Sequence, residues 1–289
     1  MVYFKTENLR KNSGSGGLTL NKRKIIAGFS ISFLLLGLAG FLYMPNKAKS
    51  EVHTGIPTVF VHGYKGTVNS FGKMLHRFEK EYNWGKKGVS YYVNADGSLY
   101  DVPHGWSKDQ PNFIQVVLEN NRTSFEESTF YLSNVLHHLK KMYKIDTVNL
   151  VGHSMGGIIS LKYSMEYQGD AYPSVDKLVT IGSPFAGIFD EDYFLIHQDR
   201  GANDLKVNSP ALQMLHTAAF PENIQVLSIG STGDVVAIPE SVASLAQIVP
   251  AAQLEQVMLE NEALGHSALH EDETVDHLIH RFLWQDLLQ

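Results

Sequence analysis

Cysteine is absent from this 289-residue sequence. Its absence excludes thiol nucleophiles, disulfides and cysteine-ligated zinc sites, and it also excludes lipid attachment through an N-terminal cysteine. A chain without cysteine suits export into an oxidising space. Metal-binding patterns are missing as well, since the sequence has neither an H-E-x-x-H segment nor an acidic calcium loop. We therefore expect no metal and no cofactor.

Positive charge is scarce beyond the first fifty residues. Residues 1–50 carry eight Lys or Arg and a single acidic residue, a balance of +7 in a chain whose net charge is −6. Residues 51–289 therefore carry −13, and an acidic body of this kind repels a phosphate backbone. We do not expect nucleic-acid binding. The composition, 44% hydrophobic and 19% charged, is that of an ordinary folded domain.

One long apolar run stands near the N-terminus. Residues 25–44 contain no charged side chain, and a helix of that length spans roughly 30 Å, the thickness of a bilayer core. The basic cluster at 22–24 directly precedes the run and favours a cytoplasmic N-terminus. We predict a basic cytoplasmic tail over 1–24, a transmembrane signal anchor over 25–44, a linker over 45–55 and a single folded domain over 56–289.

The apolar run has a second interpretation as a cleaved signal peptide. The apolar core of a signal peptide is usually about 7–15 residues long, which is shorter than the run over 25–44. Retention of this segment places the protein in the cell membrane with its domain extracellular. Cleavage makes the domain a secreted protein.

From residue 56 onward, short apolar runs alternate with amphipathic helical patterns. This alternation predicts an α/β fold with a mostly parallel sheet and helices on both faces, whose ligands sit beyond the carboxyl ends of the strands. Residues 89–102 hold two β-rich runs around Asp96-Gly97 and predict an extra hairpin. The other predicted strands cover 57–63, 112–119, 147–154, 177–184, 224–231 and 256–261. The predicted helices cover 68–82, 124–144, the stretch directly after Ser154, and 272–287.

The segment Gly152-His153-Ser154-Met155-Gly156 fits the pattern G-x-S-x-G. It lies between an apolar strand and a helix, the context in which this pattern forms a sharp turn that exposes the serine hydroxyl. The two glycines remove side chains that would collide at the turn, and the N-terminus of the following helix favours an anion. We predict that Ser154 is a nucleophile.

A serine nucleophile of this type requires an acid and then a histidine later in the chain. Asp234 comes directly after the strand predicted over 224–231, and His266 falls between the last strand and the last helix. We predict Asp234 as the acid and His266 as the base, with His270 as the alternative base. Three rival acids lie in an earlier connection, namely Asp190, Asp192 and Asp204.

The predicted mechanism is nucleophilic catalysis through an acyl-enzyme. His266 takes the Ser154 proton, Ser154 attacks a carbonyl, and Asp234 orients the imidazole. Two backbone N–H groups should stabilise the oxyanion. We expect one from Met155, directly after the nucleophile, and the other from Tyr64 in the turn after the first strand.

With these motifs in place, the sequence resembles the α/β-hydrolase superfamily over about residues 55–287. In particular it is similar to Gram-positive cell-surface hydrolases of poorly defined function. The resemblance implies a triad of Ser154, Asp234 and His266 and a lipase-like or esterase-like reaction. It rests on VFVHGYKG, LVGHSMGG, TIGSPFAG, the segment around Asp234, and HSALHEDETVDHLIHRFLW.

The expected substrate is a small-molecule or lipid ester. Amide cleavage and acyl transfer are alternatives, because the same three residues serve all of these reactions. A non-catalytic surface binding module is a further alternative, although such a module has no need of all three residues. Six residues near strand ends are equally suited to line an acyl pocket or to belong to the core: Thr67, Asn69, Phe71, Phe185, Ile188 and Phe189.

Overall fold

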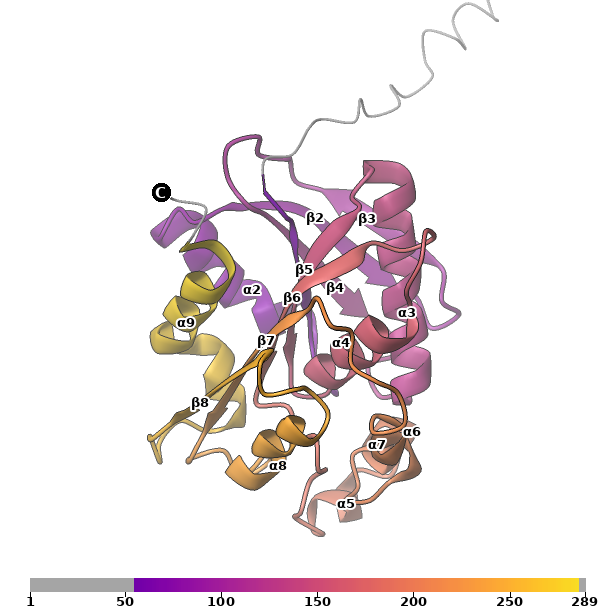
Figure 1. Ribbon diagram of the computed structural model, residues 1–289, viewed down its shortest axis with the longest axis vertical. Coiled ribbons are helices and arrows are strands. Elements are labelled where there is room, and N and C mark those ends of the chain that lie inside the picture. Colours follow the sequence, from indigo (N-terminus) through magenta and orange to yellow (C-terminus); the bar gives the residue numbers. More distant parts are fainter. Residues whose placement is uncertain (1–54, 286–289) are drawn as a thin grey trace, which may run out of the picture. The chain divides into compact units, whose positions relative to one another are not determined.

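The computed structural model describes residues 55–285 (Figure 1). The tail predicted over 1–24, the anchor predicted over 25–44 and nearly all of the predicted linker lie outside the described residues. Within the described range, none of the helices combines the length and the apolar composition that a bilayer crossing requires.

An eight-stranded sheet forms the centre of the domain, with the strand order β3-β2-β4-β1-β5-β6-β7-β8. Each neighbouring pair is parallel except β2 and β3, which are antiparallel. The α/β-hydrolase type of fold expected from the sequence is therefore confirmed. The strands are β1 (Thr58–Val61), β2 (Lys86–Val93), β3 (Leu99–Pro103), β4 (Asn112–Leu118), β5 (Thr147–His153), β6 (Ser174–Ile181), β7 (Gln225–Ser231) and β8 (Leu254–Leu259).

The predicted hairpin is present, but its first arm has a larger role than expected. The turn closes where Asn94 N–H donates to Ser98 O at 2.8 Å. β2 is itself a parallel strand of the central sheet, paired with β4 over its whole length. Five of its eight residues are buried and α3 packs against it, so only β3 is an addition at the edge.

Helices cover both faces of the sheet (Figure 1). α2 (Val68–His76) and α9 (Glu273–Trp284) lie on one face, and α3 (Phe125–His138) and α4 (Met155–Glu166) lie on the other. α2 and α3 continue as single π-helical turns, Arg77–Glu81 and Leu139–Tyr143. The remaining helices are short: α5 (Tyr193–Ile196), α6 (Arg200–Asp204), α7 (Pro210–Met214), α8 (Pro239–Ala243) and the 3₁₀ turns Ser244–Gln247 and His266–Glu271.

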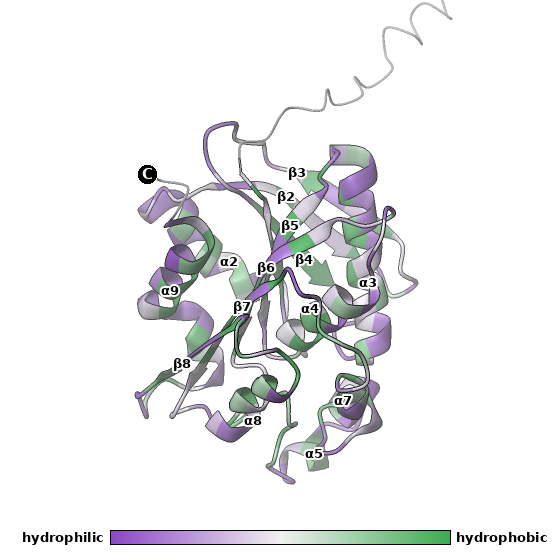
Figure 2. Cartoon of the chain, viewed as in Figure 1, coloured by the Kyte–Doolittle hydropathy of each residue, from purple (hydrophilic) through white to green (hydrophobic). Residues whose placement is uncertain are grey.

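Side chains of β1 show how the sheet serves two cores. Phe60 belongs to the core under α2 and α9, whereas Val59 and Val61 belong to the core under α3 and α4. This alternation follows from the two-residue period of a strand. In Figure 2, hydrophobic green recurs along strands of the sheet and on the helices that cover it. A sheet buried on both faces holds the carboxyl ends of its strands in fixed relative positions.

Candidate active site

Ser154 occupies the turn between β5 and α4. Its backbone has φ 56° and ψ −129°, a conformation that non-glycine residues rarely adopt. A Cβ added at Gly152 would lie 2.4 Å from the backbone of Gly156, and one at Gly156 would lie 2.1 Å from Val61 O. Only glycine fits either position. The predicted tight turn is therefore present, and the packing shows why it requires glycine at both positions.

The predicted acid and the predicted base are joined directly. His266 Nδ1 lies 2.7 Å from Asp234 Oδ2. The side chain of Asp234 is fully buried, and its other oxygen accepts from the N–H groups of Val236 and Ala237 at 2.9 and 2.8 Å. An acceptor fixed in this way favours a proton on His266 Nδ1, which leaves Nε2 free to accept one. Among the described residues, none of the rival acids Asp190, Asp192 and Asp204 makes a hydrogen bond to His266 or His270; Asp190 accepts from Asp192 N–H and Asp204 from Phe125 N–H.

Ser154 and His266 line one cleft of about 300 Å³. It opens beyond the carboxyl ends of the central strands, as expected for a parallel sheet. No hydrogen bond joins the two side chains in the described part of the chain, and such contacts often tighten only when substrate binds. His270 lines the same cleft, so both histidines considered from the sequence face the candidate nucleophile.

His153, which the sequence analysis did not single out, contacts the predicted base His266. Its Nε2 lies 3.0 Å from His266 O, and its ring centroid is 4.7 Å from those of both His266 and His270. Burial, followed by the two neighbouring imidazoles, holds the pKa of His153 well below its ordinary value. The neutral ring donates its Nε2–H to the His266 carbonyl and so holds the backbone of His266 in place. The only sequence signal is its place directly before Ser154.

The two turns that carry the expected oxyanion donors pack against each other. A Cβ placed on Gly63 would be 2.7 Å from Ser154 Cβ and 3.3 Å from Met155 N, so the turn after β1 packs directly on the serine turn. Within the described residues, the N–H groups of Tyr64 and Met155 donate to no protein acceptor. His62 holds the turn, since its Nε2 accepts from Leu118 N–H at 2.9 Å and its Nδ1 lies 2.9 Å from Gly63 O.

The side chain of Tyr64 has a separate contact. Its hydroxyl donates to Asp199 Oδ2 at 2.6 Å, and its ring lies 5.6 Å from that of His197. Asp199 also caps α6 by accepting from Ala202 N–H at 3.1 Å. The turn that carries the expected oxyanion donor is therefore tied to the long connection between β6 and β7.

Of the two alternatives left open for the residues near strand ends, acyl pocket or core, the structure supports the core for the buried ones. Phe71 lies in the core against Phe60, with ring centroids 5.4 Å apart, and Phe185 and Ile188 are also buried in the core. Phe189 is half exposed, but it lines a different hollow. A position next to a strand end therefore does not determine where a side chain points, because Phe71, Phe185 and Ile188 point into the core. The walls beside Ser154 come instead from Tyr64, Tyr193, His197 and Val236.

Gly182, directly after β6, is a second residue that the sequence analysis missed. It has φ +54°, and an added Cβ would lie 2.9 Å from Leu269 Cδ1, 3.1 Å from Asp234 Oδ2 and 3.5 Å from His266 Nδ1. A side chain here would press on the hydrogen-bonded pair itself. The sequence feature that could have identified Gly182 is its position at the end of a predicted strand, in TIGSP.

We expect Gly182→Ala to lower kcat by about tenfold, because the new methyl group displaces the Asp234–His266 pair from its productive geometry. The left-handed backbone adds roughly 1–2 kcal/mol of destabilisation. Gly169→Ala is the matched control, since Gly169 has φ +99° but no atom within 4 Å of an added Cβ. Steady-state kinetics and urea denaturation of both variants check the prediction, which equal kcat values would contradict.

Two fully buried histidines predict acid sensitivity. Burial lowers the pKa of His62, and it lowers that of His153 further. A histidine whose folded pKa lies below its unfolded value of about 6.5 contributes stability above that pH and loses it as pH falls. Each contributes at most about 1.4 kcal/mol per pH unit. Urea midpoints measured from pH 7.5 to 5.5 should therefore fall, and His62→Gln should weaken the dependence. A midpoint constant over this range would contradict the prediction.

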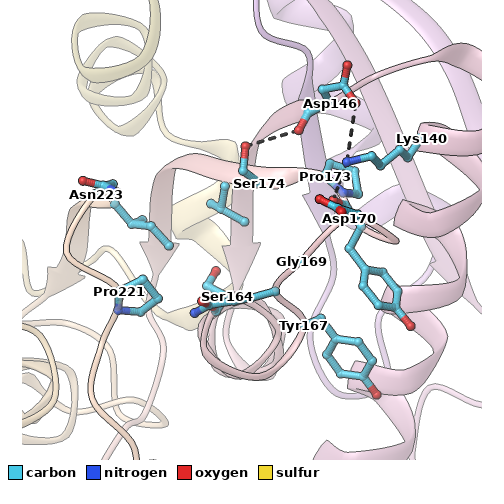
Figure 3. A pocket seen from close by; sticks show the side chains of 14 residues that line it. Lys140, Asp146, Ser164, Tyr167, Gly169, Asp170, Pro173, Ser174, Pro221 and Asn223 are labelled. Atoms are coloured by element: carbon cyan, nitrogen blue, oxygen red, sulfur yellow. Dashed lines mark hydrogen bonds and ion pairs between the residues drawn. The ribbon is translucent and has the colours of Figure 1, made fainter.

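A second hollow of about 370 Å³ lies at the opposite edge of the sheet, where β5, β6 and β7 begin (Figure 3). Ser164, Pro221 and Asn223 line it, and Lys140 pairs with Asp146 at 3.4 Å. None of the predicted site residues lies there. Among residues 55–285, no group of three or more His, Asp or Glu side chains is arranged to hold a metal ion.

Comparison with known proteins agrees with this architecture. A solved gene product of Listeria innocua has a TM-score of 0.64 at 22% identity, covering 80% of this chain and 95% of that one. A protein of Lactobacillus plantarum named as a cell surface hydrolase has a TM-score of 0.61 at 21% identity, covering 81% and 92%. At these identities the likeness shows the fold alone.

The curated relatives are much longer than this chain. GPI inositol-deacylase B of Yarrowia lipolytica is 24% identical over 225 residues, which is 68% of this chain and 21% of that protein. The chain spans between 21% and 36% of the length of the curated relatives it matches. A family model described as "Alpha/beta hydrolase of unknown function (DUF915)" matches residues 45–286. The chain therefore belongs to this family of α/β hydrolases.

Proposed function

We propose that the chain is a serine hydrolase that cleaves carboxylic esters through an acyl-enzyme. The observation that carries the proposal is the 2.7 Å contact between buried Asp234 and His266, which lines the same cleft as Ser154. Ser154 is the nucleophile, His266 the general base and Asp234 the group that orients the imidazole. These are the three residues that the sequence predicted for these roles.

In the proposed reaction, His266 Nε2 removes the hydroxyl proton of Ser154 as Oγ attacks the ester carbonyl. The N–H groups of Tyr64 and Met155 bind the resulting oxyanion, and each such donor lowers the barrier by about 3 kcal/mol. His266 then protonates the leaving alcohol. A water molecule, deprotonated by the same imidazole, releases the acid from Ser154.

The family and the relatives support acyl chemistry. Members of the family are α/β hydrolases, and the relative in Yarrowia lipolytica is named an inositol-deacylase. Removal of an acyl group is the half-reaction proposed here for Ser154. We take an ester as the substrate because a small-molecule or lipid ester is the expectation from the sequence.

We further propose that the catalytic domain lies outside the cell membrane, held there by residues 25–44. The basic cluster before that apolar run supports this orientation. The neighbour named as a cell surface hydrolase is consistent with it. Sequencing the N-terminus of the mature protein tests retention, and a start near Lys49 would instead indicate secretion after cleavage.

A fluorophosphonate probe tests the central proposal, because it forms a stable adduct only with an activated serine. We expect the adduct on the peptide that contains Ser154, with competition by p-nitrophenyl butyrate. Peptide mass spectrometry locates the adduct. Folded protein that resists the probe would favour a surface binding module instead.

A further inference from the structure

Three strongly exposed apolar side chains belong to the two segments that also supply residues to the Ser154 cleft. Ile196, Val235 and Leu195 are 77%, 76% and 69% exposed, the highest values among the large hydrophobic residues that the structure describes. They come from two segments, one on each side of β7 in the sequence. Their chain neighbours line the cleft itself: Tyr193, His197 and Val236. We call Leu195, Ile196 and Val235 the apolar rim.

The rim makes little contribution to the core of the domain. α5 reads Tyr-Phe-Leu-Ile, yet none of its four residues is buried. Figure 1 shows α5 at the same end of the domain as α8, and Figure 2 colours it as a hydrophobic helix. Single exposed apolar residues are common, but a group of them beside a cleft marks a surface that contacts something apolar.

The acidic residues near the rim disfavour partners with a negatively charged surface. Asp190, Glu191 and Asp192 are exposed directly before α5. They outnumber the two lysines placed nearby, Lys206, whose Nζ lies 5.5 Å from the Phe194 ring, and Lys65 in the cleft. An anionic surface would be repelled by these carboxylates. Two copies packed rim to rim would bring the two acidic runs together, which disfavours self-association. An apolar layer with an uncharged or zwitterionic surface would not be repelled by these carboxylates.

The size of the cleft agrees with a partner that stays largely outside it. Its volume of about 300 Å³ is at the lower end of the range for small-molecule sites. Such a cleft accommodates an ester carbonyl and the atoms next to it. The remainder of a long acyl chain would extend past Tyr193 and Val236 and over the rim.

We propose that the apolar rim rests on a zwitterionic lipid surface and delivers long-chain lipid esters from that surface to Ser154. The delivery step rests on the proposed function, whereas the contact between the rim and lipid does not. The substrate class is therefore an ester embedded in a lipid layer, with its acyl chain lying against Leu195, Ile196 and Val235.

Lipid contact is tested without reference to activity. In the full-length chain, Ile196→Trp should be quenched at least twofold more by brominated phosphatidylcholine vesicles than the wild-type background from the three native tryptophans. Met142→Trp is the matched control, because Met142 is 55% exposed just before β5, at the opposite edge of the sheet. Equal quenching of the two variants refutes the contact. A crosslink from residue 196 to a second copy of the chain would also refute the contact with lipid.

Delivery is tested with the triple variant Leu195→Ser, Ile196→Ser, Val235→Ser. We expect at least a fivefold loss of kcat/KM for p-nitrophenyl palmitate held in phosphatidylcholine vesicles. Hydrolysis of dissolved p-nitrophenyl acetate should change less than twofold, and Met142→Ser should affect neither substrate. An equal loss on both esters overturns the delivery step. Absence of hydrolysis in the wild type contradicts the proposed function, and the quenching result still decides the contact.

Discussion

Ser154→Ala should lower kcat/KM for p-nitrophenyl butyrate by about 10⁴- to 10⁶-fold, the range typical of removing the nucleophile of a Ser-His-Asp triad. The loss should fall on kcat, because attack by Oγ contributes to the transition state and not to ester binding. The residual rate would come from the N–H groups of Tyr64 and Met155, which the substitution leaves in place. Steady-state kinetics on purified protein measures both quantities.

Folding should be unaffected by this substitution. The Ser154 hydroxyl caps no helix and makes no side-chain hydrogen bond in the described structure, and alanine meets the same backbone strain at φ 56°. Ser267→Ala is the matched control, since Ser267 is an exposed serine in the same cleft. A Ser154→Ala protein that retains more than a tenth of the activity would end the catalytic interpretation.

The serine turn could be predicted from sequence because its causes are local. Gly152 and Gly156 lie two residues either side of Ser154, and the contacts that require them come mainly from the turn itself and from β1. The chain order of nucleophile, acid and base then limited the choice to a few residues. Asp234 and His266 follow successive strands at the same sheet edge, so a parallel topology was enough to bring them together.

Features that depend on contacts between distant segments could not be predicted in the same way. Gly182 is constrained by Asp234 and His266, and Tyr64 is held by Asp199, 135 residues away. Neither contact leaves a pattern in its own neighbourhood. The choice between cleft and core stayed open for Phe71 for the same reason, because spacing along the chain does not show which of the two a side chain near a strand end faces.

His266→Ala should cost at least about 10⁴-fold in kcat, whereas His270→Ala should stay within tenfold of the wild type. Both rings line the cleft and both lie 4.7 Å from His153, so proximity does not separate them. The two histidines differ in that only His266 makes a hydrogen bond to Asp234 within the described structure. His270 packs instead against Phe71, at 6.2 Å between ring centroids, and burial lowers its pKa.

Stability measurements make this comparison decisive. Removing the His266 ring leaves a buried carboxylate at Asp234 with one oxygen unpaired, which should destabilise the fold by about 1–3 kcal/mol. His266→Asn keeps a donor for that oxygen and should recover part of the stability without recovering kcat. Urea denaturation and ester hydrolysis of all three variants separate the two effects. A larger loss of kcat in His270→Ala than in His266→Asn would transfer the role of base to His270.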